Sequence, residues 1–425
     1  WGFIKKTVSY SSHCSRDLGA SLKKNEEDVR MNPHRHQSLL WPARQAGQEA
    51  TFAKPTLLLI GPTPPPFHGV AVAIRTLLQS RIMDLFHVWH LELADRRGIQ
   101  YVNKPDLHDV FLFVRQWLRL VGRLCRTRPN LTYLVLSQST VGFLRDSFLI
   151  WPAYLRGSPF LLHLHGGNFR DWFLGRNWIM KAYVKALLCR ATHVIVLGES
   201  LRCHFDGLVE ASRIAVVSNG IDWNSDGLPV KLTGRRSTYR IFHLSTLSHL
   251  KGALVLLKAV PIVAQNRQDV EFVFAGPWSH REDQRWAEQF VEQQGISKCV
   301  YFSGQVEGDE KRALFESADV FVFPGVQQEG QPLVVIEAMA AGLPVIFTDR
   351  GCLRDTVLDG KTGFEVPIDD PRSLADRILW LLDHPSERKA MGTSARRRYE
   401  ALYTKTRHIE NMMDVLAASC SGTAA

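Results

Sequence analysis

Glu329 and Glu337 are the side chains whose types and spacing first suggest chemistry in this sequence. The apolar pattern of Leu333–Ala341 predicts a helix, with Pro332 at its first position and Gly342 ending it. Glu337 is the only charge in that helix, so its carboxylate must be paired or hydrogen-bonded if it is buried. Glu329 lies just ahead of the helix N-terminus, where backbone N–H groups favour anions. Two carboxylates beside an anion site suit a polyhydroxylated ligand that carries phosphate.

Another interpretation of the same two glutamates involves no site. Glu337 would then be an N-terminal-turn residue that interacts with the helix dipole, and Glu329 would be a solvated loop residue. Short apolar runs at Val320–Phe323 and Val345–Phe347 predict buried parallel strands on either side. This arrangement would place both carboxylates at the carboxyl edge of a sheet.

Two segments in the first half of the chain also place polar or flexible residues at the ends of predicted strands. His165 follows the predicted strand Pro159–Leu164 and precedes a Gly-Gly turn, at the edge where open α/β sheets bind ligands. A lone histidine there is equally consistent with a structural role. Thr56–Ile60 is a predicted strand that continues into a Gly/Pro-rich loop ending at Gly69 and a helix. That topology can cradle phosphate, although the loop is not G-x-G-x-x-G and a rigid crossover explains it as well.

Strands and helices alternate in two successive series, which predicts an α/β protein with two Rossmann-like domains whose parallel sheets face a deep interdomain cleft. The segment Trp223–Ser237 lacks a regular pattern and is the expected linker. The expected organisation is a mostly disordered tail at 1–54, an N-terminal Rossmann-like domain at 55–220, a C-terminal Rossmann-like domain at 221–402, and a C-terminal helix at 403–419 that packs back on the N-terminal domain.

Three helical segments are rich in basic residues. Asn168–Cys189 is expected to form one helix, and Ser394–Ala418 is expected to be helical and basic at its start. Phe111–Arg128 is expected to form an amphipathic helix with one stripe of arginines. The simpler interpretation of that stripe is a solvated face, and the alternative is contact with an anionic membrane.

The composition describes an ordinary globular protein with a basic balance. The 425 residues carry a formal net charge of +10, which suggests an acidic partner such as nucleotide phosphates, an anionic membrane or nucleic acid. The seven cysteines are scattered without a C-x-x-C pair, which argues against a disulfide framework or a zinc site and for a reducing compartment. Without a long apolar run or a signal-peptide core, we expect a cytoplasmic protein.

The segment from Glu329 to Ile346 resembles the E-x7-E signature of retaining GT-B glycosyltransferases of the family-4 type, and the resemblance extends over roughly residues 55–415. Further matching segments are the Gly-Pro…His-Gly-Val opening loop, His165-Gly166, Ser218–Asp222 and Lys251-Gly252. The opening loop and the Leu-Ser-x-Leu…Lys-Gly segment are similar to those of enzymes that build bacterial surface polysaccharides.

The resemblance implies that the N-terminal domain at 55–220 binds the acceptor and that the C-terminal domain at 221–402 binds the nucleotide-sugar donor. It also implies a role for each candidate residue. Glu337 would accept hydrogen bonds from the ribose hydroxyls of the donor, and Val306 would lie close to its base. Glu329 would contact hydroxyls of the transferred sugar and stabilise positive charge at the anomeric carbon. Lys251 would pair with the departing diphosphate, and His165 would hold the donor sugar at its 6-hydroxyl. Further contacts to the donor are implied for the backbone at Gly69, Gly330, Gln331, Pro332, Leu333 and Val334.

One position departs from the family pattern. Thr246 stands where the family has an arginine, five residues before Lys251. Three consequences are open: a slower enzyme, a hydrogen bond from Thr246 to the diphosphate, or another cation such as Arg75 or Arg350 in the arginine's place.

The implied activity is hexosyl transfer from a UDP- or GDP-sugar to a glycan or lipid-linked acceptor, with retention and without a cofactor. The sequence has no D-x-D motif, so no catalytic metal is expected. Cell-surface polysaccharide or glycolipid synthesis at the inner face of a membrane, through peripheral contact, is the implied setting. A nucleotide-sugar epimerase or hydrolase of the same architecture is the alternative enzyme. A nucleic-acid-binding protein is disfavoured because no recognised nucleic-acid motif is present.

Overall fold

A computed structural model describes residues 54–65, 69–93, 107–223 and 238–421. Residues 54–425 form one compact unit of the chain. We call its residues 54–223 the N-terminal domain and its residues 238–402 the C-terminal domain. The expected tail at 1–54 and the expected linker at 223–237 lie almost wholly outside the described residues.

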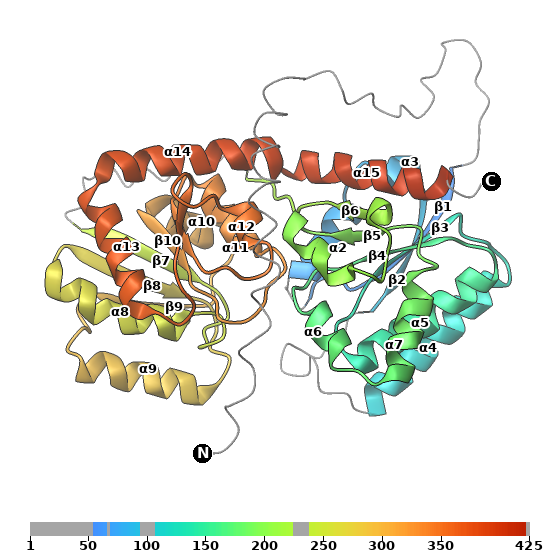
Figure 1. Cartoon of the computed structure of the whole chain (residues 1–425), viewed down its shortest axis with the longest axis horizontal. Helices are drawn as coiled ribbons and strands as arrows, with labels where there is room; N and C mark the ends of the chain where they lie inside the picture. The colour runs from blue at the N-terminus through green and yellow to red at the C-terminus, as the bar shows by residue number, and fades with distance from the viewer. Residues whose placement is uncertain (1–53, 66–68, 94–106, 224–237, 422–425) are drawn as a thin grey trace, which may run out of the picture. The chain divides into compact units, whose positions relative to one another are not determined.

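The N-terminal domain contains a six-stranded sheet whose neighbouring strands are all parallel (Figure 1). Its spatial order is β2-β1-β3-β4-β5-β6, so the direction of winding reverses between β1 and β3. The strands are β1 (Thr56–Gly61), β2 (His87–Glu92), β3 (Leu131–Val135), β4 (Phe160–His163), β5 (Val194–Val196) and β6 (Ile214–Val216). The helices are α2 (Gly69–Leu78), α3 (Ile82–Leu85), α4 (Leu107–Leu124), α5 (Thr140–Leu155), α6 (Phe169–Leu174), α7 (Trp178–Leu188) and the 3-10 helices η2 (Glu199–Phe205) and η3 (Ala211–Arg213).

The C-terminal domain contains a second parallel six-stranded sheet, of order β12-β11-β10-β7-β8-β9. This is the Rossmann order, and its winding reverses between β7 and β10. The strands are β7 (Tyr239–Leu244), β8 (Val270–Ala275), β9 (Val300–Gly304), β10 (Val320–Phe323), β11 (Val345–Phe347) and β12 (Gly363–Glu365). The helices are α8 (Ala253–Asn266), α9 (Arg281–Gln293), α10 (Gly308–Ser317), α11 (Leu333–Ala340), α12 (Leu353–Thr356), α13 (Pro371–Asp383) and α14 (Pro385–Leu402), and the chain continues into α15 (Lys405–Ser421).

Both faces of each sheet are covered, which explains why the central strands read as continuous apolar runs. In β1, Leu58 and Ile60 belong to the core beneath α4, α5 and α7, while Leu57 and Leu59 face α2 and α15. In β7, Ile241 belongs to the core shared with α8 and α13, while Phe242 faces α10 and α11.

The last helix, α15, packs on the N-terminal sheet although it follows the C-terminal domain in sequence. Met412 and Leu416 of α15 are buried against β1 and β3. The Ser419 hydroxyl also lies 2.8 Å from Nδ1 of His193, next to β5. Residues beyond 403 therefore contribute to the core of the first domain.

One helix prediction was wrong because it overlooked a break. Asn168–Cys189 forms two helices, since Gly175 ends α6 and the side chain of Asn177 caps α7 by accepting from Met180 N at 2.9 Å.

The helical stretch Ser394–Ala418 belongs to two helices, since α14 ends at Leu402 and α15 begins at Lys405. In the intervening residues, Ile221 exchanges backbone hydrogen bonds with Tyr403 and Lys405, which replace the helical ones.

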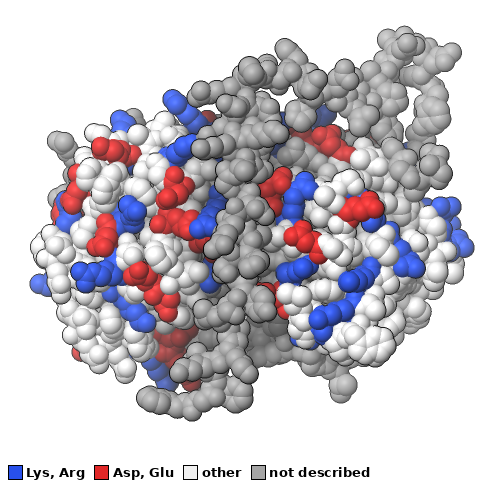
Figure 2. All heavy atoms as spheres, viewed as in Figure 1, with Lys and Arg blue, Asp and Glu red and all other residues white. Residues whose placement is uncertain are grey.

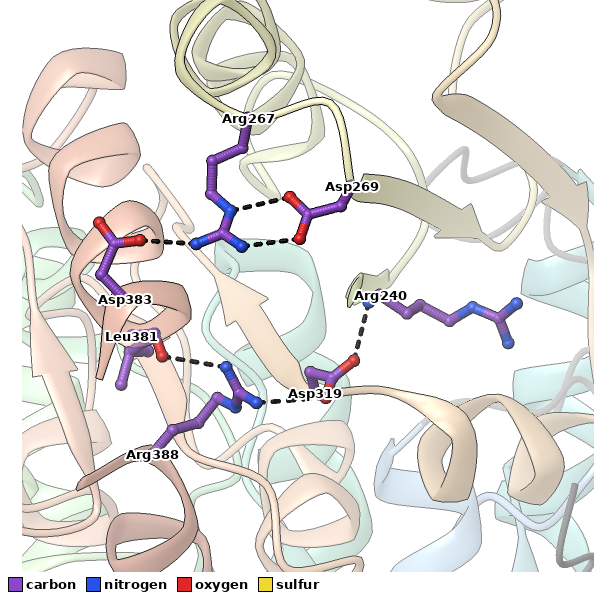
Figure 3. Close-up of polar contacts among 7 residues, drawn as sticks. All are labelled: Arg240, Arg267, Asp269, Asp319, Leu381, Asp383 and Arg388. Carbon is purple, nitrogen blue, oxygen red and sulfur yellow. Dashed lines mark hydrogen bonds and ion pairs between the residues drawn. The ribbon is translucent and has the colours of Figure 1, made fainter. Parts of the chain in front are cut away.

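Ion pairs connect residues at the edge of the C-terminal sheet where its strands begin (Figure 3). The candidate site residues lie in loops at the other edge, where the strands end. Arg267 pairs with Asp269 at 2.7 Å and with Asp383 at 2.6 Å. Asp319 accepts from the backbone N–H of Arg240 at 2.9 Å and lies 3.8 Å from Arg388. These charges join α8, α13 and α14 to the start of β7 and β10. Their role is structural, and they lie away from the candidate site.

Candidate active site

Lys251 and Glu329 meet at the point where the winding of the C-terminal sheet reverses. Lys251 lies in the loop after β7, and Glu329 lies in the loop after the neighbouring strand β10. Backbone N–H groups of Val326 and Gln327 donate to the carbonyl of Leu250, at 2.9 and 3.2 Å, which fixes the two loops against each other. The crevice outside the carboxyl ends of strands at such a point is where open α/β sheets bind ligands.

The Glu329 carboxylate is held by two donors and is not a solvated loop charge. Lys251 Nζ lies 2.6 Å from Glu329 Oε1, and Gln327 Nε2 donates to the same oxygen at 2.8 Å. The Glu329 side chain is 13% exposed and that of Lys251 is 30% exposed. The pair thus combines a nearly buried carboxylate with a cation that still reaches solvent.

Glu337 forms a second pair of the same kind. It lies in the second turn of α11, so the interpretation of Glu337 as an N-terminal-turn residue is wrong. Lys311 of α10 places Nζ 2.7 Å from Glu337 Oε1, while the buried Oε2 has no hydrogen-bond partner. Burial raises the pKa of Glu337, and Lys311 opposes that rise. A buried carboxylate with one oxygen held and one left over can accept hydrogen bonds from a ligand.

His165 is brought to the Glu329 loop by contact between the two domains. A Cβ at Gly330 would overlap the carbonyl oxygen of His165, and a Cβ at Gly167 would overlap that of Glu329. The two loops can approach this closely only because both positions are glycine. His165 follows β4, so the carboxyl edges of both sheets contribute to one place.

The buried His163 packs against the ring of His165. The rings of His163 and His165 lie 3.9 Å apart between centroids, tilted by 32°. His163 Nδ1 in turn lies 2.7 Å from the hydroxyl of Tyr133 on β3. Burial lowers the pKa of His163 well below its ordinary value, and the neighbouring His165 adds to this. His163 is therefore neutral at physiological pH.

The segment from Gly330 to Val334 leads directly into α11. Pro332 is the N-cap and Leu333 the first helical residue, one position later than the sequence suggested. Gln331 is buried, and its side chain is already engaged: Oε1 accepts from Asn219 N at 2.7 Å, and Nε2 donates to Thr356 at 3.0 Å. A contribution of Gln331 to a donor would therefore come from its backbone.

The remaining predicted residues occupy loops or helix starts after other strands. Gly69 begins α2, in the unit that follows β1, and is exposed. Thr246 is exposed in the loop after β7, and Val306 is buried between β9 and α10. Each lies after the carboxyl end of a strand, as a ligand at that edge would require.

One functional candidate, Lys311, could not have been found by pattern, because it is one of several charges in a polar helix. Arg350, named from the sequence as a possible replacement for the family arginine, follows β11. Arg350 precedes Gly351, whose N–H donates to Gln328 Oε1 at 3.0 Å beside Glu329. The buried Nε of Arg350 has no hydrogen-bond partner. Only the folded chain brings these two cations to the edge that carries the glutamates.

Part of the chain is similar to known proteins. Residues 230–398 match the family described as Glycosyl transferases group 1. The phosphatidyl-myo-inositol mannosyltransferase of Mycobacterium leprae (strain TN) is 38% identical over 154 residues, 35% of this chain and 39% of that protein. The D-inositol 3-phosphate glycosyltransferase of Paenarthrobacter aurescens (strain TC1) is 33% identical over 163 residues, 38% of this chain and 40% of that protein. The chain spans about two fifths of the length of these curated relatives.

A solved structure extends the similarity to both domains. Anabaena Alr3699/HepE in complex with UDP and glucose has a TM-score of 0.67 and 17% identity, and the match covers 85% of this chain and 99% of that one. At this identity the likeness concerns the fold. Residues 230–398 are thus similar to the glycosyl transferases group 1 family, and the fold of the chain matches that of GT-B glycosyltransferase structures. None of the three proteins is named as an epimerase or hydrolase, so the comparisons give that alternative no support.

Proposed function

We propose that this protein is a retaining glycosyltransferase that moves a hexose from a UDP- or GDP-sugar to an acceptor hydroxyl in cell-surface polysaccharide or glycolipid synthesis. The observation that carries the proposal is the Lys251–Glu329 pair, 2.6 Å apart at the reversal point of the C-terminal sheet and against the His165 loop. Two similar proteins support a glycosyltransferase activity: one is named a phosphatidyl-myo-inositol mannosyltransferase, and the solved structure holds UDP and glucose.

In the proposed reaction the bond between the anomeric carbon and the leaving phosphate oxygen breaks, and a bond from the acceptor oxygen to that carbon forms on the same face. The acceptor proton passes to the departing diphosphate. Lys251 stabilises the charge that develops on the diphosphate, and Glu329 stabilises positive charge at the anomeric carbon. His165 holds the sugar, Val306 lies near the base, and Glu337 accepts from the ribose.

We propose that no metal takes part. Positive charge toward the diphosphate comes from Lys251 and from the first N–H groups of α11, at Leu333 and Val334, with the backbone at Gly69 adding donors from the other domain. Within the described residues, no three His, Cys, Asp or Glu side chains gather in a way that could hold a metal ion. The test is chelation: EDTA should leave the transfer rate unchanged, and a strict requirement for added Mg²⁺ would contradict the proposal.

Arg350 is the better of the two candidates to replace the family arginine at Thr246. Arg350 adjoins the loop of Glu329 through Gly351, and its Nε is unpartnered. Arg75 lies in the last turn of α2, six residues and therefore about 9 Å along the helix from Gly69. Arg350→Met should slow transfer, whereas Arg75→Met should not.

The acceptor we propose is a glycan or a lipid-linked sugar, which the protein would reach from the cytoplasmic face of a membrane by peripheral contact. Among the described helices, none has both the length and the apolar character needed to cross a bilayer. The name of the mycobacterial relative refers to a phospholipid acceptor, which supports a lipid-linked one here.

The experiment that tests the function measures nucleotide diphosphate release from a panel of UDP-, GDP- and ADP-sugars, with and without a membrane-lipid extract. Release from one donor that depends on the extract would establish a transferase and identify its donor. Release that ignores the extract would favour a hydrolase. No release from any donor would contradict the proposal.

A further inference from the structure

More than half of the exposed large apolar side chains among the described residues lie on α4, α5 and α7. The three helices cover one face of the N-terminal sheet, and α5 contacts both neighbours: Phe148 packs near Phe113 of α4, and Trp151 donates to Tyr183 of α7 (Figure 1). Six of their large side chains are between 47% and 80% exposed: Phe111, Val114, Leu118, Phe148, Leu155 and Trp178. We call the outer surface of these helices the three-helix surface.

Apart from Asp109 in the first turn of α4, the exposed charges of the three-helix surface are positive. Residues 110–128 include five arginines and no acid, and residues 174–190 include four basic residues and no acid. The single acid between positions 139 and 158 is Asp146, which is fully buried and paired with Arg145 at 2.8 Å. Figure 2 shows blue and white side chains over this part of the molecule. Exposed apolar groups beside cations, without a compensating carboxylate, fit an anionic surface that has an apolar interior.

A second copy of the chain fits this surface poorly. A symmetric dimer would place the same patch against itself, so the arginines of α4 would face arginines without a carboxylate to pair with. A bilayer has no such conflict, because its headgroups are negative and its acyl chains accept Phe111, Leu118 and Trp178. The chain connects the surface to the candidate site, since α6 and then α7 follow the His165–Gly167 loop in sequence.

We propose that the three-helix surface docks this protein on a bilayer that contains anionic lipids. The inference deepens the proposed function, because docking there would hold the site next to a lipid-linked acceptor. Arginines supply long-range attraction, and the apolar side chains enter the boundary between headgroups and acyl chains. Docking itself requires no sugar transfer, so the two proposals can fail separately.

Co-sedimentation of the full chain with vesicles tests the docking. The vesicles contain phosphatidylcholine alone or phosphatidylcholine with one third phosphatidylglycerol. We expect wild type to bind the anionic vesicles, less so at high salt. Phe111→Ser/Leu118→Ser should weaken that binding by at least ~10-fold, since burying each of these side chains is worth about 1.5–3 kcal/mol. Arg115→Gln/Arg119→Gln should abolish the preference for anionic vesicles.

The matched control is Met83→Ser/Leu85→Ser on α3, where both side chains are 43% exposed. It should bind vesicles like wild type. Failure of wild type to bind anionic vesicles, or unchanged binding of Phe111→Ser/Leu118→Ser, would overturn the docking. A lipid-free dimer that Phe111→Ser/Leu118→Ser converts to a monomer would identify a protein interface instead. UDP and GDP binding, measured in parallel without vesicles, reports on the proposed function alone.

A second inference concerns Lys311, which the family resemblance left without a role. Its ammonium holds Oε1 of Glu337 at 2.7 Å, across 26 residues of sequence, and the Lys311 side chain is 31% exposed. The neighbours of Glu337 on α11, Ile336 and Ala338, are fully buried. An unpaired carboxylate in these surroundings would be strongly disfavoured.

We infer that Lys311 is a positioning residue: it fixes the Glu337 carboxylate so that the unpartnered Oε2 remains available to the donor's ribose hydroxyls. This inference rests on the proposed function. Without Lys311, Glu337 would either take up a proton or turn toward solvent, and in both cases it would lose the acceptor geometry that recognises a diol.

The test compares binding of UDP and GDP with their 2′,3′-dideoxy analogues. Lys311→Met should weaken binding of the ribonucleotide by ~10-fold or more and should barely change binding of the dideoxy form. Lys311→Arg should restore the difference, because a guanidinium can hold the same oxygen. Glu310→Gln, an exposed charge on the same helix, is the matched control and should behave like wild type.

Equal weakening of both nucleotide forms in Lys311→Met would mean a merely structural role and would overturn the inference. The same conclusion follows if wild type does not distinguish the two forms. If wild type binds neither UDP nor GDP, the proposed function fails as well, so the two failures are distinguishable.

Discussion

Removing Lys251 gives the sharpest test of the site. The change Lys251→Met takes away the cation that lies 2.6 Å from Glu329 and, in the proposed reaction, faces the departing diphosphate. A unit charge 4 Å from another is worth about 4 kcal/mol at an effective dielectric constant of about 20. Because the Lys251 side chain is 30% exposed, we discount this for screening to about 3 kcal/mol, which corresponds to a ~10²-fold loss of kcat.

The Glu329→Ala variant should lose a similar factor, because it removes stabilisation at the anomeric carbon. Since the two side chains contact each other, their effects should not add: the double variant should be faster than the product of the single losses predicts. The assay is release of nucleotide diphosphate under saturating donor. Lys258→Met is the matched control, an exposed lysine of α8 that stacks 5.7 Å from Trp286.

Near-wild-type rates in both Lys251→Met and Glu329→Ala would refute the assignment of the site. A loss in Lys258→Met of the same size would show that the assay reports stability, since this lysine lies away from both carboxylates. Circular dichroism of each variant separates the two causes.

The fold and the domain contact supply three more predictions. Burial lowers the pKa of both His204 and His243 to about 4. As pH is lowered from 6.5 to 4, the unfolded chain therefore takes up protons that the folded chain does not, and the free energy of unfolding decreases by about 1.4 kcal/mol per pH unit for each histidine. Urea denaturation at pH 7.5 and pH 5 measures this, and equal midpoints would contradict it. Asp319→Ala should cost about 1–3 kcal/mol, because Arg240 N loses its acceptor, yet should leave nucleotide binding intact; weaker UDP binding at full stability would be the wrong outcome. Gly330→Ala should reduce transfer more than it reduces the melting temperature, because the added Cβ pushes His165 away from Glu329, and normal kinetics would exclude that close approach as a requirement.

Much of the C-terminal domain could be predicted from local pattern. Strands such as Val270–Ala275 are buried on both faces, so their apolar runs are unambiguous. Glycines and prolines at strand and helix ends then place the loops after β7 and β10. Lys251 and Glu329 were predicted for the same reason, because residues that follow adjacent parallel strands must share an edge of the sheet.

Where local pattern was weak, prediction failed. Strand β2 (His87–Glu92) was not expected: it lies at the edge of its sheet, and only Trp89 and Leu91 are buried, so polar residues interrupt the run. The break that ends α6 was missed because a few residues of non-helical backbone hardly alter helical periodicity.

The sequence by itself determined the α/β class, the two series of strands and the choice of the two glutamates as site residues. Burial on both faces of a sheet and the chemistry of helix ends depend on residues that are close together in the chain. Only the tertiary structure decided that Lys311 holds Glu337, that Gly330 admits the His165 loop, and that α4, α5 and α7 share one exposed apolar face. These relations join residues far apart in the chain. They depend on which strands lie side by side, and the spacing of residues within a short segment does not determine strand order.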